Sequence, residues 1–423
     1  MSKQKKSKKK LLLISYTFPP NNAIGGRRWG KFAKELFRLN YDVKVLTFNN
    51  KNKHPFSNWS EDIASLKNHI SYVPDNYPQW LDSPKSSIDK ILYRFSLLYV
   101  KLKAKGNYYD RASFLRAQTL KQTEFFIQQG YTNVIVTCAP FKLALWVSEL
   151  IPKYPQVNFI VDFRDPWTNN FTSYGLNSMS EKRIRTENEA ERRVINRFHK
   201  IIVVAQEMKD YFINKYRVSN EHFSVISNGF DEDDFREVED VSRLYFQNNT
   251  KIRIVFAGTF YENATYLLQK LADTIRSEKL FLDQFEFHFF GTLPVQATAI
   301  VNSLKTCFFY HGQIELKKVY SVISNSDFCA LFLTNDINYS LSTKFHEYLS
   351  QNKKIIVFSN NGDTGKFVEK NNLGIGIGPD DMHSSLLRVI EMHKNKTNLS
   401  SETFLFQDYN VKNLVKKIEI LLK

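Results

Sequence analysis

The sequence predicts an α/β protein with two domains, each built on a doubly wound parallel sheet. Short apolar runs alternate with amphipathic helical segments along most of the chain, which is the order of strands and helices in such sheets. The alternation stops in a largely polar segment, 236–250, and then starts again. The chain has 423 residues, 43% of them hydrophobic, so it is long and apolar enough for two or three domains with sizeable cores.

The first domain is expected at 11–235, behind a basic tail at 1–10. Strands of a parallel sheet are buried on both faces and therefore read as continuous apolar runs. Runs of this kind predict strands at 11–18, 43–48, 133–138, 158–163 and 200–205. Apolar side chains recur at helical spacing through 29–39 and predict the helix that follows the first strand.

The second domain is expected at 251–405, after a linker at 236–250 that ends in the breaker-rich sequence Gln-Asn-Asn-Thr. Its predicted strands are 252–257, 285–290, 307–310, 328–333, 354–358 and 374–377. The last part of the chain, 406–423, contains a lone amphipathic helix that is expected to cross back to the first domain. Ligands of doubly wound sheets bind beyond the carboxyl ends of the strands. We therefore expect the two Rossmann-like domains to face each other across a cleft lined by those loops.

The net charge of +16 predicts a polyanionic partner, which is a nucleic acid, an anionic membrane surface or a phosphorylated substrate. No nucleic-acid-binding motif accompanies the charge, so a nucleic acid is not expected. The basic tail at 1–10 either touches anionic lipid or only keeps the chain soluble.

A second candidate for a membrane surface is the segment 88–102. Its apolar and basic residues separate at helical spacing, as in helices that lie on a bilayer, whereas packing of the apolar face against its own domain is the alternative. The apolar face is Ile88, Leu92, Phe95, Tyr99 and Leu102, and the basic residues largely off that face are Lys90, Arg94, Lys101 and Lys105.

The three cysteines, Cys138, Cys307 and Cys329, are widely spaced and lie in apolar runs, which argues against a disulfide framework or a zinc site. No apolar run approaches the roughly 18–20 residues of a membrane span. The basic N-terminus leads into a predicted strand and not into a cleavage site, so it is not read as a signal peptide. These features predict a cytoplasmic protein, either free or peripheral on the inner face of the membrane.

The most informative motif is Ser-Thr-Lys-Phe-His-Glu-Tyr-Leu at 342–349. A helix that begins here would direct the free N–H groups near Ser342 and Thr343, and the charge of Lys344, toward a phosphate. Glu347, one turn later, suits the two hydroxyls of a ribose. A capped surface helix fits the same residues equally well when the motif is taken alone.

Glycines at predicted strand ends favour the nucleotide interpretation of that motif. Gly258 with Thr259, Gly291, and Gly312 with Gln313 each follow an apolar run of the second domain. Because the carboxyl ends of parallel strands meet at one edge of the sheet, they predict a floor for a nucleotide.

The loop after the first strand is a candidate anion site. Gly25 and Gly26 allow a ligand to approach the backbone closely, and Arg27 follows them at the expected start of a helix. The spacing is not that of the dinucleotide fingerprint, so NAD is not expected. A flexible loop with solvated arginines is the alternative.

The segment Asp-Phe-Arg-Asp-Pro-Trp at 162–167 carries charge at the end of a strand that is nearly all apolar. Asp165 is predicted to act as a base or to orient a sugar hydroxyl, and Arg164 to pair with Asp162 or to hold phosphate. Trp167 is predicted to stack on a sugar ring. A structural ion pair that caps the turn is the alternative.

Taken in order, these motifs resemble the GT-B glycosyltransferases of family 4 (group 1), particularly bacterial enzymes that build surface polysaccharide. The resemblance includes the Pro-Pro…Gly-Gly…Arg loop, the Asp-Phe-Arg-Asp-Pro-Trp segment, Ser-Asn-Gly-Phe-Asp at 227–231, the Ala-Gly-Thr strand end and the Lys-Phe-His-Glu-Tyr-Leu motif. It implies transfer of a sugar from a UDP- or GDP-linked donor to a glycan or lipid-linked acceptor, with retention and without a metal or cofactor. It places Glu347 at the donor ribose, and Gly25 and Gly26 near the donor phosphates and the acceptor.

Three positions depart from that family. Tyr339 stands where many members have a second glutamate, the segment 258–262 lacks a basic pair, and the loop 138–142 lacks a histidine. The cations for the leaving diphosphate are then expected to be Lys344 with Arg27 or Arg28. A sugar-nucleotide epimerase and a non-catalytic relative are the alternatives.

Overall fold

The structure is a computed structural model that divides into two compact units. Unit 1 comprises residues 1–227 and 414–423, and unit 2 comprises 228–413. The residues described are 8–21, 24–49, 59–74, 77–81, 86–103, 111–170, 176–236, 238–247, 250–334, 341–360, 362–395 and 406–423.

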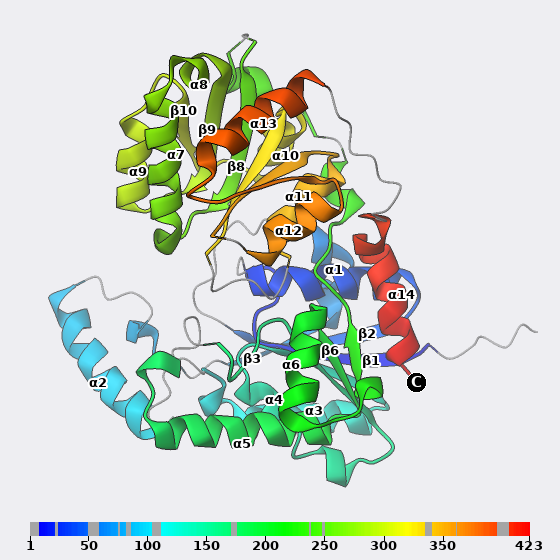
Figure 1. Ribbon diagram of the computed structural model, residues 1–423. Coiled ribbons are helices and arrows are strands. Elements are labelled where there is room, and N and C mark those ends of the chain that lie inside the picture. The colour runs from blue at the N-terminus through cyan, green and yellow to red at the C-terminus, as the bar shows by residue number, and fades with distance from the viewer. Residues whose placement is uncertain are drawn as a thin grey trace, which may run out of the picture. The chain divides into compact units, whose positions relative to one another are not determined.

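Within these residues unit 1 forms a seven-stranded parallel sheet in the order β3-β2-β1-β4-β5-β6-β7 (Figure 1). The order reverses between β1 and β4, and β1 pairs with both β2 and β4 through Leu11–Ser15. The strands are β1 (Lys10–Ser15), β2 (Asp42–Asn49), β3 (Ile70–Pro74), β4 (Asn133–Cys138), β5 (Asn158–Phe163), β6 (Lys200–Val203) and β7 (Phe223–Val225).

Helices cover both faces of this sheet. Because parallel crossovers are right-handed, the helix that precedes the reversal, α1, lies on one face, and the helices of the later crossovers lie on the other. The helices of this unit are α1 (Ile24–Arg38), α2 (Ser87–Lys103), α3 (Arg116–Gln128), α4 (Lys142–Val147), α5 (Glu181–Arg197) and α6 (Gln206–Tyr216), with a long 3-10 helix, η1 (Glu61–His69), after β2.

The end of the chain is bonded to unit 1 through α14 (Val411–Leu421). Asn158 Nδ2 donates to the carbonyl oxygen of Leu421 at 2.8 Å, and the N–H of Lys423 donates to Asn133 Oδ1 at 2.9 Å. Both asparagines are buried at the first positions of their strands. Buried amides need hydrogen-bond partners, and the C-terminal backbone supplies them here.

Unit 2 repeats the architecture with a six-stranded parallel sheet over the described residues, in the order β10-β9-β8-β11-β12-β13. The order again reverses beside the first strand, between β8 and β11. The strands are β8 (Ile252–Thr259), β9 (Phe285–Thr292), β10 (Phe308–Gly312), β11 (Phe328–Phe332), β12 (Lys354–Phe358) and β13 (Gly374–Ile377), and the helices are α7 (Thr265–Ser277), α8 (Lys279–Gln284), α9 (Val295–Asn302), α10 (Leu316–Ser324), α11 (Thr343–Ser350), α12 (Asp363–Lys370) and α13 (Met382–Lys394).

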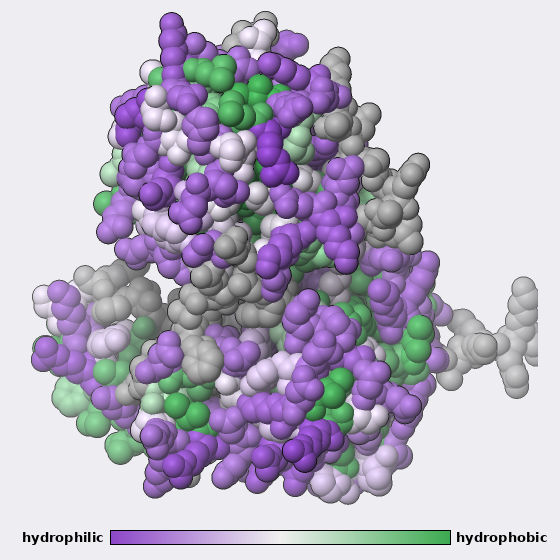
Figure 2. Space-filling model, viewed as in Figure 1, coloured by the Kyte–Doolittle hydropathy of each residue, from purple (hydrophilic) through white to green (hydrophobic). Residues whose placement is uncertain are grey.

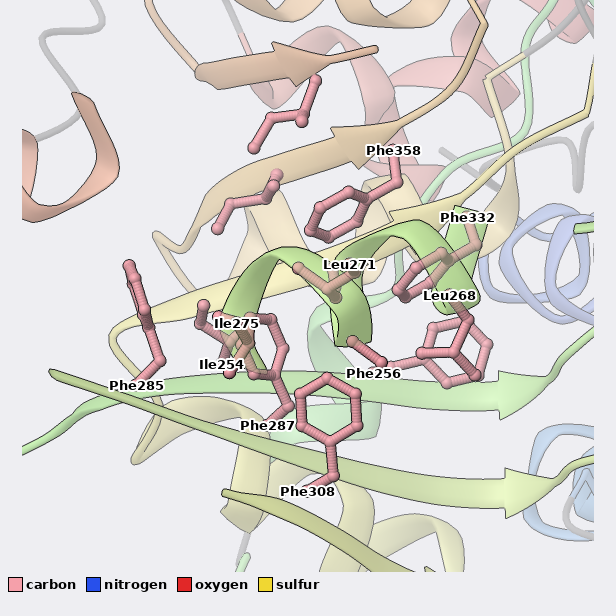
Figure 3. Close-up of a cluster of buried hydrophobic side chains, with 14 of the residues drawn as sticks. Ile254, Phe256, Leu268, Leu271, Ile275, Phe285, Phe287, Phe308, Phe332 and Phe358 are labelled. Carbon is pink, nitrogen blue, oxygen red and sulfur yellow. The ribbon is translucent and has the colours of Figure 1, made fainter. Parts of the chain in front are cut away.

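The sheet of unit 2 has a hydrophobic core on each face. Successive strand residues point to opposite faces, so Ile254 and Phe256 join one core while Val255 and Ala257 join the other. The first core packs α7, α9 and α13 against a phenylalanine-rich face of the sheet (Figure 3). The second core packs α10, α11 and α12, and so fixes α11 against β8 and β12.

The predicted α/β class and doubly wound topology are confirmed. All eleven predicted strands are present, and four of them, β4, β5, β12 and β13, have the predicted bounds. The prediction missed β3 and β7. Both strands lie at a sheet edge, are short and are only partly buried, so neither shows the continuous apolar run of a central strand.

Two further observations concern the cysteines and the helices of the described residues. Cys138, Cys307 and Cys329, all of which are described, are buried and form no disulfide. None of the described helices has the length and hydropathy required to cross a membrane.

Candidate functional site

The strongest candidate site lies in unit 2, where the strand order reverses between β8 and β11. Ligands of doubly wound sheets bind at such a switch point, beyond the carboxyl ends of the strands. Gly258 and Thr259 end β8 and pair in register with Gly291 and Thr292 at the end of β9. Gly312 ends β10, one strand further from the switch point. The structure thus brings the predicted strand-end glycines to one edge of the sheet.

The helix predicted to begin at Ser342 is α11. Ser342 is its N-cap residue, and the hydroxyl of Ser342 accepts the N–H of Phe345 at 3.2 Å. The first N–H groups of a helix, here those of Thr343 and Lys344, have no acceptor in the preceding turn of the same helix. The cap therefore fixes where α11 begins and directs a partial positive charge toward the carboxyl edge of the sheet.

Lys344 connects α11 to the end of β8. Its Nζ donates to the carbonyl oxygen of Thr259 at 2.9 Å and lies 4.5 Å from the centre of the Phe256 ring. Among the described residues, no carboxylate lies within ion-pair distance of this amine. Burial lowers the pKa of Lys344 to about 8, and the negative charge of Glu347 partly offsets that effect. A partly desolvated cation bonded to a neutral carbonyl is an arrangement that an anionic ligand would stabilise.

A side chain at position 258 is incompatible with this placement of Lys344. Gly258 has φ +125°, in the region that side-chain-bearing residues rarely adopt, and a Cβ there would overlap Cε of Lys344. Glycine at position 258 therefore allows the positive φ of the backbone and leaves room for the Lys344 side chain.

Two buried tyrosines that the sequence did not assign to the site hold this edge in place. The hydroxyl of Tyr348 accepts the N–H of Ala257 at 3.0 Å, and β11 pairs with β8 only as far as Val255. The tyrosine thus satisfies a backbone group where the two strands part, and so opens the switch point without an unpaired buried N–H. Tyr320, on α10, brings its hydroxyl to 3.4 Å from Glu347 Oε1.

The residues around Gly312 are occupied by contacts within the sheet edge. Gln313 Nε2 donates to Thr292 Oγ1 at 2.8 Å. His311 Nε2 lies 2.9 Å from His288 Nδ1, and the two rings stack with an interplanar angle of 5°. Burial lowers the pKa of His311 to about 4, so this pair is neutral at pH 7. His311 is therefore a packed polar residue rather than an acid at neutral pH.

In unit 1, three loops meet at the corresponding switch point. Arg164, just after β5, donates from Nε to the carbonyl oxygen of Cys138 at 2.7 Å and from Nη2 to that of Ala139 at 3.3 Å. Its Nη1 occupies the space that a Cβ at Gly25 would need. Arg164 and Gly25 are thus brought together although 138 residues separate them, and Gly26 follows in the first turn of α1. Asp165, half-buried, is the next residue after Arg164.

The predicted pair between Arg164 and Asp162 is wrong. Asp162 is fully buried within β5 and accepts bonds from Trp29 Nε1 at 2.7 Å, Thr137 Oγ1 at 3.0 Å and Arg28 Nη2 at 3.1 Å. The expectation that Arg28 serves the diphosphate is not supported either. Arg28 also donates to the carbonyl oxygens of Ile226 and Ser227, so it ties β5 to the chain after β7. Burial lowers the pKa of Arg28, and Asp162 opposes that effect.

The predicted sugar-stacking role of Trp167 is also wrong. Its indole is fully buried, stacks on Phe141 with ring centres 5.2 Å apart, and donates from Nε1 to Glu187 Oε2 at 3.0 Å. No face of the ring is left for a sugar. Arg27, the other predicted phosphate ligand of this region, lies over the ring of Trp59 at 4.6 Å.

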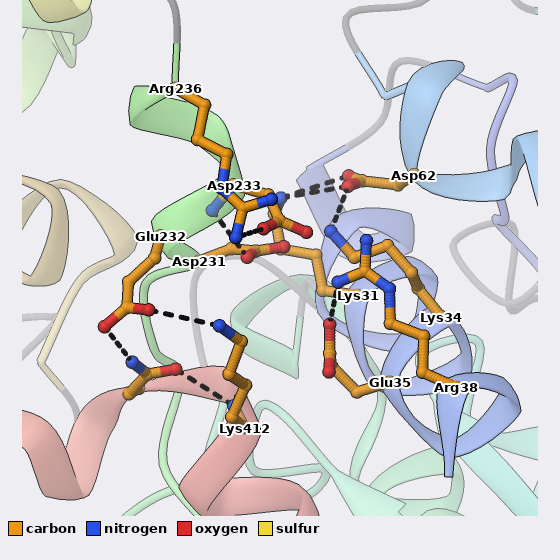
Figure 4. Close-up of polar contacts among 11 residues, drawn as sticks. Lys31, Lys34, Glu35, Arg38, Asp62, Asp231, Glu232, Asp233, Arg236 and Lys412 are labelled. Atoms are coloured by element: carbon orange, nitrogen blue, oxygen red, sulfur yellow. Dashed lines mark hydrogen bonds and ion pairs between the residues drawn. The ribbon is translucent and has the colours of Figure 1, made fainter.

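Polar contacts within each unit explain further charged residues (Figure 4). Within unit 1, Lys31 and Lys34 of α1 both bind Asp62, at 3.1 and 3.0 Å. Within unit 2, Glu232 accepts bonds from Asn410 at 2.7 Å and Lys412 at 3.1 Å. The Ser-Asn-Gly-Phe-Asp motif precedes Glu232, and the boundary between the units falls after its serine.

Comparison with known proteins agrees with this geometry. Residues 144–234 match the family model described as Glycosyltransferase Family 4, a stretch that includes β5, the Asp-Phe-Arg-Asp-Pro-Trp segment and the Ser-Asn-Gly-Phe-Asp motif. No curated protein matches the chain in sequence.

Solved structures match nearly the whole chain. The N-terminal domain of trehalose-6-phosphate phosphatase from Candida albicans matches with a TM-score of 0.65 and 12% identity, over 100% of this chain and 98% of that one. Alr3699/HepE from Anabaena, in complex with UDP, matches with a TM-score of 0.62 and 14% identity, over 98% and 99%. A glycosyltransferase from Rickettsia africae matches with a TM-score of 0.59 and 15% identity, over 98% of each chain.

The chain has the GT-B fold. This confirms the fold that the order of motifs predicted, and the matched family model agrees with the predicted glycosyltransferase resemblance. In a GT-B protein both sheets are doubly wound, which accounts for the identical strand-order reversals in units 1 and 2. The bacterial surface-polysaccharide subtype and the individual site residues stay predictions. Tyr339, one of the positions that depart from the family, lies outside the described residues.

Proposed function

We propose that this protein is a glycosyltransferase that moves a hexose from a nucleotide-sugar donor to a hydroxyl of an acceptor. The observation that carries the proposal is the placement of Lys344 against Thr259 and Gly258 at the switch point of unit 2, with Glu347 one helical turn further on. The lysine suits a diphosphate and the glutamate a ribose. Alr3699/HepE, which has a similar fold, is known in complex with UDP and with UDP-glucose, which supports a nucleotide sugar as the donor.

The residues present suit the departure of a nucleoside diphosphate. Negative charge on the leaving phosphates grows in the transition state, and preorganised positive groups stabilise it most effectively. The helix start at Thr343 and the Lys344 amine would supply those groups, so we propose a reaction that requires no metal or cofactor. Within unit 1, Arg164 beside Gly25 is a proposed anion ligand, and Asp165 is the proposed group that orients or deprotonates the acceptor hydroxyl.

Further parts of the proposal rest on the family resemblance. They are retention at the anomeric carbon, a UDP- or GDP-linked donor, a glycan or lipid-linked acceptor in surface-polysaccharide synthesis, and a cytoplasmic location. Product analysis by NMR would read the anomeric configuration directly. A rate that is insensitive to EDTA would support the metal-free mechanism, whereas a loss that Mg²⁺ or Mn²⁺ restores would contradict it.

The site assignment is tested by Glu347→Ala. If Glu347 binds the ribose, this change should raise the donor KM at least tenfold, since one charge-assisted hydrogen-bond pair contributes about 1.5–3 kcal/mol. Glu391→Ala, at an exposed glutamate on α13, is the matched control and should leave the kinetics unchanged. Equal donor KM values for Glu347→Ala and the wild type would refute the assignment.

The donor is found first by a thermal-shift screen with UDP, GDP and their common hexose conjugates, because a ligand that binds only the folded state raises its melting temperature. Conversion of the donor is then measured with and without an acceptor. Conversion of the donor to another nucleotide sugar, independent of any acceptor, would indicate the epimerase instead. Binding without turnover of any donor would indicate the non-catalytic relative.

A further inference from the structure

Helix α2 presents an apolar stripe to solvent. Six large apolar side chains along it are between 47% and 73% exposed, whereas other exposed apolar residues of the described chain, such as Val295 and Leu244, belong to other helices. An exposed apolar surface of this extent marks a contact site more often than chance. The α2 stripe consists of Ile88, Ile91, Phe95, Leu98, Tyr99 and Leu102.

The stripe exists because α2 is anchored to unit 1 by its other side. Ser96 and Val100 are buried on that side. Tyr99, at the edge of the stripe, also stacks its ring on Phe114 with centres 5.7 Å apart. The spacing 88, 91, 95, 98, 102 advances by three and four residues in turn, which keeps these side chains on one side of a helix. The alternative of packing against its own domain therefore does not hold. The exposed face also differs from the predicted one, because Leu92 is half-buried while Ile91 and Leu98 are exposed.

Basic residues flank the stripe. Lys90, Arg94 and Lys101 are all exposed, and at 100° per residue they lie together beside it. The one acidic residue in the helix sequence, Asp89, lies away from the stripe and accepts the N–H of Ser86 at 2.8 Å. The exposed side of α2 thus combines an apolar strip with a positive border. In Figure 2 the apolar side chains of this region appear at the lower left, over α2.

The charge distinguishes between possible occupants of this surface. A second copy of the chain would bring Lys90 and Arg94 of both helices to the same seam, and like charges there are destabilising. An anionic bilayer matches both features, since acyl chains accept the stripe and lipid phosphates accept the basic border. The helix has 17 residues and so is about 25 Å long, and can lie along a membrane surface.

We propose that α2 docks this protein on an anionic lipid membrane, with the α2 stripe among the lipid headgroups and Lys90, Arg94 and Lys101 at the phosphates. This surface lies outside the candidate donor site, so the proposal stands independently of the proposed activity. In this proposal the membrane is bound both by the apolar stripe of a folded helix and by the charge of the basic residues. The contact should therefore retain part of its strength in high salt, because apolar insertion is not screened.

The test is co-sedimentation of the full chain with phosphatidylcholine vesicles that contain 30% phosphatidylglycerol, and with pure phosphatidylcholine vesicles. The double variant Phe95→Asp with Leu98→Asp should bind the anionic vesicles at least tenfold more weakly than the wild type. Val295→Asp with Leu244→Asp is the matched control, because it changes two apolar residues that are more exposed still and changes the net charge by the same amount. This control should stay within about twofold of the wild type. Lys90→Glu with Arg94→Glu should weaken binding by about fivefold or more per charge.

Stripe residues are exposed, so the variants should keep the wild-type melting temperature and circular dichroism. A second measurement does not depend on these substitutions. In Phe95→Trp, brominated lipids should quench additional fluorescence relative to the wild type, as expected for a ring at headgroup depth. The proposal is overturned if the wild type fails to bind anionic vesicles at low salt, or if the stripe variant binds as well as the control. It is also overturned if the stripe variant loses a dimer in light scattering while its vesicle binding is unchanged.

Discussion

Replacement of Lys344 by methionine should stabilise the free protein. Burial lowers the pKa of the amine to about 8 from its ordinary 10.5, and this difference corresponds to about 3 kcal/mol by which the fold disfavours the charged form. The side chain of Lys344 is half-buried, so solvent screening makes this value an upper limit. Methionine also gives up the bond to the Thr259 carbonyl, which contributes about 1 kcal/mol. The net expectation is a gain of about 1–2 kcal/mol at pH 7.

The gain should depend on pH with a definite sign. Below pH 8 both the folded and the unfolded wild type carry the protonated amine, and the folded state bears the full cost. Between pH 8 and 10.5 the unfolded state binds more protons than the folded state, so wild-type stability rises with pH from this group. The advantage of Lys344→Met should therefore shrink across that interval. At pH 7 it corresponds to a rise in melting temperature of about 2–4 °C per kcal/mol for a domain of this size.

Binding of UDP should change in the opposite direction. The lysine–phosphate bond is lost, which weakens binding by about 1.5–3 kcal/mol, or about 10- to 150-fold. In the wild type the fraction of protonated Lys344 falls about tenfold from pH 7 to pH 9 when the pKa is about 8, and UDP affinity should fall in parallel. Titration of the nucleotide itself affects both proteins equally, so the ratio of the two dissociation constants isolates the lysine.

Urea denaturation and calorimetry with UDP measure the two effects on the same samples. Lys270→Met, at an exposed lysine of α7, is the control and should change neither quantity. A Lys344→Met protein that is no more stable than the wild type, and whose UDP affinity follows the same pH profile, would refute the reasoning. Stability gained together with affinity lost would show that the fold holds this cation in place for its ligand.

Three further predictions concern single side chains. Gly258→Ala should cost about 1–3 kcal/mol in urea denaturation and weaken UDP binding, because an alanine at φ +125° is strained and displaces Lys344. Stability should fall as pH drops from 6.5 toward 4, since burial lowers the pKa of His311 to about 4 and the unfolded state then binds more protons. His311→Gln should reduce that dependence without abolishing it, because burial also lowers the pKa of His288, and an unchanged acid limb would contradict the prediction. Arg28→Met should cost about 3–5 kcal/mol, because it leaves the fully buried Asp162 without its cation, and a loss below about 1 kcal/mol would argue against that pairing.

The fold was largely predictable because its central strands are continuous apolar runs. The strands 133–138 and 158–163 were predicted residue for residue, since both faces of β4 and β5 are covered and every position is buried. The edge strands β3 and β7 lack that signature. The order of the strands within each sheet could not be predicted from the sequence. The reversal between β8 and β11 follows from tertiary pairing, and only this reversal shows why Lys344 meets Thr259 at the switch point.

Exposure was the property that periodicity could not predict for α2. A stripe that repeats at helical spacing looks the same whether a sheet or a membrane covers it. The sequence also predicted the wrong set of exposed residues for α2. Ser96 faces the protein although it is polar, while Ile91 and Leu98 face solvent. Because Ser96 and Val100 are the buried residues of this helix, the six apolar residues of the stripe lie on the side that faces solvent.

The errors at 162–167 have a common physical cause that the sequence already contained. Asp162 pairs in register with Thr137 and with Ile202, so it lies inside the strand, where its side chain points into a layer between sheet and helices. Such a carboxylate must be satisfied by buried donors, and three surround it. Arg164 comes after the last paired residue, Phe163, and is therefore free of the ladder and turned toward Gly25. Since the strand was predicted to end at 163, the same prediction placed Asp162 in the core and Arg164 at the edge. A polar residue at a strand end is a ligand candidate only when it follows the last pair of the ladder.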